Sequence, residues 1–202
     1  MRLLIALCLA ALTAACALPS SVSSSYDPTS KKGVGLVVGS ITYESAYGSY
    51  GVMVKSADGS FTEYVYVGAA QITMFVTMTD PQLQQRGGTF AIELPAGDYK
   101  ITSWHVRQGP RSSNSTAPID IPFRVEEGGY TYLGALHWDR HWENVSLVDQ
   151  SSRDIPLLQT RHPALSNARF TSAIRPGATV EKLGGGYVYH RDYPIFIPVI
   201  AR

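Results

Sequence analysis

Cysteine is scarce in this chain, which has two among its 202 residues, Cys8 and Cys16. Cys8 lies in an apolar N-terminal stretch that starts at Leu3. Removal of that stretch leaves Cys16 as the one cysteine, and a single thiol forms no internal disulfide and no cysteine-based metal or redox site. The sequence therefore excludes these kinds of cysteine chemistry for the rest of the chain.

Neither sign of charge is in excess, because 17 lysines and arginines face 16 aspartates and glutamates. Removal of residues 1–15 takes away one basic residue, Arg2, and no acidic residue, so the remainder is formally neutral. Nucleic-acid binding depends on clustered cations that neutralise phosphates. We therefore expect no nucleic-acid partner.

Catalytic sequence motifs are also missing. Ser40 follows Gly39, but the second glycine of a G-x-S-x-G nucleophile motif is not there. The glycines within 33–39 open a predicted strand instead of following one, so they do not form a dinucleotide-binding loop. We expect no cofactor, and the pattern favours a non-catalytic protein over an enzyme.

The N-terminus has the parts of a secretory signal: Arg2, an apolar run and the small pair Ala14-Ala15 before Cys16. The run of about ten apolar residues is too short to span a bilayer, which takes about 20. The segment resembles the lipobox of bacterial lipoproteins, although Thr13 stands where leucine is usual. That resemblance implies cleavage before Cys16 and acylation of this residue.

Acyl chains on Cys16 imply a lasting membrane anchor, because each buried methylene contributes about 0.8 kcal/mol. Ala17 stands where an aspartate retains such proteins at the inner membrane, so the resemblance implies an outer-membrane location, facing the periplasm. Two alternatives stay open: an ordinary cleaved signal with an incidental cysteine, and an uncleaved N-terminal anchor. We predict a signal over 1–15, a lipidated cysteine with a flexible Ser-rich tether over 16–32, and one domain over 33–202.

Apolar residues alternate with polar ones along much of the domain, at 72–78, 89–94 and 119–126. This period of two is typical of half-buried strands, and Gly and Asp residues mark tight turns between them. The sequence predicts an all-β fold, an antiparallel β-sandwich with one short helix at 152–162. A long polar loop is expected at 108–118 and a last strand at 195–200.

Two segments resemble a known group of proteins. Residues 90–99 match the pattern F-x-I-x-L-P-x-G-x-Y of a hairpin in prealbumin-like and immunoglobulin-like sandwiches. Residues 125–134 are similar to a strand pair that follows it in uncharacterised small bacterial envelope lipoproteins. The resemblance implies a prealbumin-like or immunoglobulin-like β-sandwich and brings no activity with it.

His137, Asp139 and His141 form the densest group of metal-ligating residue types. On a continuous strand they share one face, where two imidazoles and a carboxylate supply three zinc ligands. Residues two apart on a flat strand are about 6.6 Å apart, so the three meet at one ion only if the strand bulges. The alternative is a polar strand end whose tryptophans cover the rim of the sandwich.

Trp104, Trp138 and Trp142 suggest an aromatic surface for a glycan or a partner protein, together with Tyr64 and Tyr66. The alternative is that these rings fill the core. The sequence favours a binding or assembly module of the cell envelope that is anchored to the membrane by acyl chains and has an unidentified protein or glycan partner. The competing interpretation is a metal-assisted envelope hydrolase centred on the histidine pair.

Overall fold

The computed structural model describes residues 22–23, 25–45, 48–67, 79–142, 144–185 and 187–191. The predicted signal, Cys16, Glu143 and the predicted strands at 72–78 and 195–200 lie outside these ranges. The described residues are mostly β-structure with one α-helix, so the all-β expectation is confirmed. The helix α2 (Ser151–Arg161) lies within one residue of its predicted bounds.

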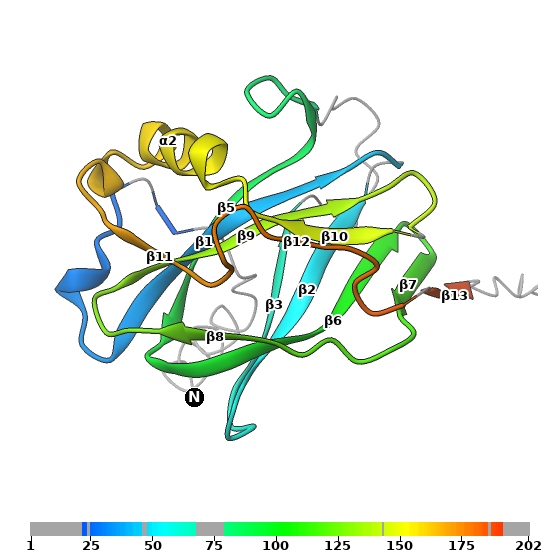
Figure 1. Cartoon of the computed structure of the whole chain (residues 1–202), viewed down its shortest axis with the longest axis horizontal. Helices are drawn as coiled ribbons and strands as arrows, with labels where there is room; N and C mark the ends of the chain where they lie inside the picture. The colour runs from blue at the N-terminus through cyan, green and yellow to red at the C-terminus, as the bar shows by residue number, and fades with distance from the viewer. Residues whose placement is uncertain are drawn as a thin grey trace, which may run out of the picture.

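The strands form two sheets, which we name sheet A and sheet B (Figure 1). Sheet A has the order β12 (Thr179–Val180), β10 (Val145–Val148), β9 (Tyr130–Trp138), β1 (Val34–Tyr43), β5 (Gln85–Pro95), β4 (Thr79–Asp80), with β11 (Phe170–Ser172) beside β9. Sheet B has the order β13 (Tyr187–Arg191), β7 (Arg111–Ser115), β6 (Gly97–Gln108), β2 (Ser49–Ser56), β3 (Thr62–Val67), with β8 (Ile121–Val125) beside β6.

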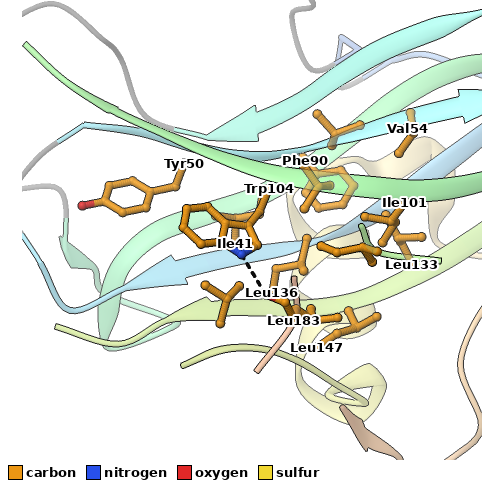
Figure 2. Packing of buried hydrophobic residues seen from close by; sticks show 14 of the residues in the cluster. Ile41, Tyr50, Val54, Phe90, Ile101, Trp104, Leu133, Leu136, Leu147 and Leu183 are labelled. Carbon is orange, nitrogen blue, oxygen red and sulfur yellow. Dashed lines mark hydrogen bonds between the residues drawn. The ribbon is translucent and has the colours of Figure 1, made fainter. Parts of the chain in front are cut away.

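One core joins the two sheets. Alternation along β5 turns Phe90 inward as predicted, and Ile41 and Leu136 of the same sheet are buried with it. Val54 and Trp104 meet them from sheet B (Figure 2). Full burial of side chains of this size contributes roughly 1.5–3 kcal/mol each, so the contact between the sheets is the main source of stability.

A second apolar cluster, which we call the outer cluster, lies on the other face of sheet A. Leu36 of β1 and Tyr132 of β9 pack there against Leu158 of α2 and Leu165 of the 3-10 helix η2 (Pro163–Leu165). Figure 1 shows α2 lying over this sheet on the side away from sheet B. Sheet A is therefore covered on both faces over part of its length.

The described part of the predicted tether belongs to this outer layer, and we call residues 22–23 and 25–33 the leader. The Val22 N–H donates to the Ala91 carbonyl at 2.8 Å, and Tyr26 packs against the outer cluster. Lys31 pairs with Glu93 at 2.8 Å. These residues, for which a flexible tether was expected, contact sheet A through two apolar side chains and one ion pair.

Strand direction and one loop also differ from the predictions. β9 runs parallel to both β1 and β11, whereas a wholly antiparallel sandwich was expected. Alternation shows which face of the sheet a residue occupies but not the direction of the adjacent strand. It therefore could not distinguish parallel from antiparallel pairing. Part of the predicted polar loop at 108–118 is β7, which pairs with β6 and β13.

Both segments that carry the family resemblance cross between the sheets. The first runs from β5 in sheet A to β6 in sheet B, through a turn at Ala96. The second runs from β8 in sheet B to β9 in sheet A. Each is therefore a corner of the two-sheet arrangement and not a hairpin within one sheet.

Gly87 and Gly88 make a matched pair for testing how closely β5 passes β1. Gly87 has φ +123°, and a Cβ there would lie 2.0 Å from the Ile41 carbonyl oxygen, whereas a Cβ on Gly88 would meet nothing within 4 Å. We predict that Gly87→Ala lowers the free energy of unfolding by about 3 kcal/mol and Gly88→Ala changes it by less than about 0.5 kcal/mol. Urea denaturation of the two variants checks this, and equal losses would contradict it.

Candidate functional site

The three tryptophans lie in the core. Trp104 is fully buried, and its Nε1 donates to the Leu183 carbonyl at 2.8 Å (Figure 2). Trp138 and Trp142 are 0% and 8% exposed and meet the Tyr50 ring edge to face, at centroid distances of 5.9 and 6.5 Å. None of these indoles presents a face to a partner, so the alternative interpretation, that they fill the core, describes them.

The proposed metal ligands do not converge. β9 ends at Trp138, and Asp139 uses its two carboxylate oxygens to accept the backbone N–H groups of His141 and Asn144, at 3.2 and 3.1 Å. His137 lies on β9, and its ring contacts Thr42 of β1 instead of Asp139. Across the ranges the structure describes, no three His, Cys, Asp or Glu side chains gather where a metal ion can be held.

His137 instead lines a polar hollow of about 170 Å³ on the outer face of sheet A. Four strands and the start of α2 form its walls, through Thr42, Gln85, Ala135, His137, Ser146, Val148, Gln150 and Arg153. The outward positions of these strands change from apolar to polar along their length. The outer cluster covers the apolar half, and the hollow opens over the polar half.

A buried carboxylate marks the boundary between the two halves. Asp154 of α2 is 0% exposed, and its Oδ2 accepts hydrogen bonds from Ser40 Oγ at 2.7 Å and the Tyr132 hydroxyl at 2.8 Å. Its Oδ1 accepts a hydrogen bond from Arg153 Nε at 2.8 Å. Such a paired and hydrogen-bonded charge is tolerated inside a protein, and these bonds attach α2 to β1 and β9.

The hydroxyl of Tyr132 remains a donor in this network. Burial raises the pKa of Tyr132 far above its ordinary value, and the adjacent Asp154 carboxylate raises it further. The phenol is therefore protonated throughout the physiological range and donates to the carboxylate. The Tyr132 hydroxyl therefore takes part in the network without a change in its protonation state.

Several groups around the hollow have hydrogen-bonding capacity to spare. The Ser146 hydroxyl faces the hollow, and it bonds to no other group among the described residues. The side-chain amides of Gln85 and Gln150 likewise have no hydrogen-bond partner within the described ranges. Arg153 commits Nε and Nη2 to Asp154 and Ser40, which leaves Nη1 for the hollow. The arrangement offers both donors and acceptors to a polar group.

His137 has partners on both sides of its ring. Nδ1 lies 2.8 Å from Thr42 Oγ1, and Nε2 lies 3.6 Å from the Glu44 carboxylate at the rim. The hydrogen bond with Thr42 orients the imidazole, which forms part of the wall of the hollow. This is the one residue of the predicted metal group that the structure places in a recess.

Sequence reasoning missed Ser40, Arg153 and Asp154. Two signals were present: Ser40 and Thr42 interrupt the apolar positions of a strand that is otherwise buried on both faces, and Asp154 immediately precedes the apolar face of α2. Neither signal identifies the partner, because the pairing joins residues 114 positions apart. The hollow itself forms only when α2 lies over half of the sheet.

Two larger hollows lie around the turns that follow β2 and β5, with volumes of about 430 and 440 Å³. Their charged groups already have partners. Arg124 pairs with Asp98 at 2.9 Å. Hydrogen bonds from Ser56 and Ser60 lower the pKa of Asp58 to about 2. These hollows therefore offer fewer uncommitted groups than the polar hollow on sheet A.

Comparison with known proteins adds little to this geometry. No family model and no curated protein matches the chain. The crystal structure of a leucine-rich repeat protein from Bacteroides thetaiotaomicron VPI-5482 is similar over 54% of this chain and 14% of that chain, at 16% identity and a TM-score of 0.29. A likeness at that score supports no inference on fold or function. None of the helices in the described ranges has the length and apolar character needed to cross a membrane.

Asp154→Asn tests the buried network. Asparagine keeps the shape but turns one acceptor oxygen into a donor that faces other donors, so we predict a loss of about 3 kcal/mol in the free energy of unfolding. Asp120→Asn is the matched control, because Asp120 is 78% exposed and its pairing with Lys100 contributes at most about 1 kcal/mol. Denaturant titration measures both; a loss for Asp154→Asn no larger than that of the control would contradict the prediction.

Proposed function

We propose that the chain is a lipid-anchored binding or assembly module of a bacterial cell envelope. Acyl chains on Cys16 attach it to the outer membrane, and the domain faces the periplasm. The sequence from Arg2 to Cys16 supports the anchor, since a short apolar run ends in small residues directly before the cysteine. The resemblance to small envelope lipoproteins supports the same location.

The domain is proposed to be a sandwich of the prealbumin-like or immunoglobulin-like kind. Two sheets with a shared core and two crossing segments are compatible with this assignment. A further contact favours it: the Tyr99 hydroxyl donates to the Pro95 carbonyl at 2.8 Å, four residues back across the corner between β5 and β6. A tyrosine bonded to the backbone upstream at such a corner is a feature of immunoglobulin-like folds.

The polar hollow is the recognition site in this proposal, and the observation that carries it is the set of uncommitted donors and acceptors around Ser146. The Ser146 hydroxyl lines the hollow, so a ligand can bond to it in place of water. The two amides and Arg153 add both donors and acceptors. A polar segment of an envelope protein or a glycan has the matching chemistry.

The competing hypothesis, a metal-assisted hydrolase, gains no support from the positions of its residues. His137 is bonded to Thr42, and Asp139 is used in a turn. No observation favours this second function, and we do not propose it.

Cys16→Ser tests the anchor, and Cys8→Ser is the matched control within the same N-terminal segment. We predict that Cys16→Ser moves the protein from the membrane fraction to the soluble periplasmic fraction, because serine has no thiol to acylate. Cys8→Ser is expected to leave it membrane-bound. Fractionation of cells that express the full chain measures this. A Cys16→Ser protein that stays with the membrane would contradict the proposal.

Photo-crosslinking tests the recognition site. A photoreactive residue replaces Gln85, which is exposed at the rim of the hollow, or Asp120, which is exposed on the segment before β8. We predict a discrete adduct in cells from position 85 and none from position 120, because the partner contacts only the hollow. Electrophoresis and mass spectrometry of the adduct identify a protein or a glycan. No adduct from position 85, or the same adduct from both, would count against the hollow.

A further inference from the structure

The leader determines how far the domain can move from its anchor. Five residues separate Cys16 from Val22, which is the first described residue and is already bonded to β5. A fully extended chain advances at most about 3.6 Å per residue, so Val22 lies within about 20 Å of Cys16. Without leader docking the first fixed residue would be Val34, with a reach of about 60 Å.

Several kinds of contact join the leader to the domain. Val22 and Tyr26 both pack against the outer cluster, and the Tyr26 hydroxyl bonds to the Glu93 carboxylate. Lys31 binds the same carboxylate, and its ammonium lies 5.2 Å from the Tyr26 ring centroid. Backbone, apolar and charged contacts therefore act together over ten residues of chain.

The docked position is on one side of the molecule. In Figure 1 the leader, coloured blue, lies on the same side as the far end of α2, and β7 and β13 lie at the opposite side. A domain of about 170 residues is roughly 40 Å across. A reach of about 20 Å is half of that width, so the domain cannot turn over freely on its anchor.

We infer that the docked leader keeps the connection between Cys16 and the domain short. It thereby holds the domain against the lipid surface with the outer cluster side, including η2, towards the bilayer. This inference rests on the proposed acylation of Cys16. The partner it names is the lipid headgroup layer of the anchoring leaflet. The leader then acts as part of the domain, and five residues separate it from Cys16.

Single-cysteine labelling tests this in the acylated full chain, because the mature protein has no other free thiol once Cys16 is acylated. Dyes at Ala164→Cys, exposed on η2, and at Arg111→Cys, exposed on β7, report energy transfer to headgroup dyes in vesicles. We expect about twofold more transfer from position 164, given a domain about 40 Å wide. Equal transfer from the two positions would overturn the inference.

Two variants separate leader docking from simple proximity. Insertion of 12 Gly and Ser residues after Ser20 adds about 40 Å of reach and is expected to make transfer from the two positions equal. Val22→Asp with Tyr26→Ala removes the docking and is expected to do the same, whereas Val22→Ile keeps the difference. An unchanged difference in the insertion variant would overturn the inference. Absence of the wild-type protein from the membrane would instead refute the anchor itself, and with it this inference.

Discussion

The outer face of sheet A has to be covered over one half and can remain open over the other, and most of the molecule's distinctive features follow from this constraint. Leu36 and Tyr132 need apolar contacts, which α2, η2 and the leader supply. Asp154 fixes α2 at the boundary through two side-chain hydrogen bonds, from Ser40 of β1 and Tyr132 of β9. The polar half beyond it becomes a hollow because α2, which covers the apolar half, begins at the boundary and does not extend over the polar half.

The same arrangement links the proposed anchor to the proposed recognition site. The leader docks at Ala91 and the hollow is lined by Gln85, six residues along the same strand. Strands rise about 3.3 Å per residue, so the hollow lies about 20 Å from the docking point. Since Val22 is at most about 20 Å of extended chain from Cys16, a partner in the hollow is within about 40 Å of Cys16. A module of this reach suits partners that are themselves close to the membrane.

Local pattern predicted local structure well. Alternation in β5 and β8 placed Phe90 and Phe123 inward, and Asp154, Pro156 and Pro163 gave the bounds of α2 to within one residue. One error is local, since β7 lies within the predicted loop at 108–118, and the others concern contacts between distant parts of the chain. Three features depend on which elements become neighbours: the parallel pairing of β1 with β9, the docking of the leader and the burial of Trp138. The alternation of apolar and polar residues along a single sequence does not show which elements these are.

The candidate site was predictable only in fragments. His137 drew attention as a possible metal ligand, and the structure places it in a wall beside Thr42. Asp154 gave no sign of its partners, since Ser40 and Tyr132 come from two other elements. A hollow made of four strands and the start of a helix has no compact motif, because each element contributes one or two side chains of ordinary type.

The central claim is that Cys16 becomes the lipid-bearing first residue of the mature protein. The measurement that tests it most directly is the intact mass of the chain purified from membranes, with fragmentation of its N-terminal peptide. We expect a chain that begins at Cys16 and carries the added mass of a diacylglyceryl group and an N-linked acyl chain. A chain that begins at Met1, or one cleaved elsewhere without lipid, would contradict it.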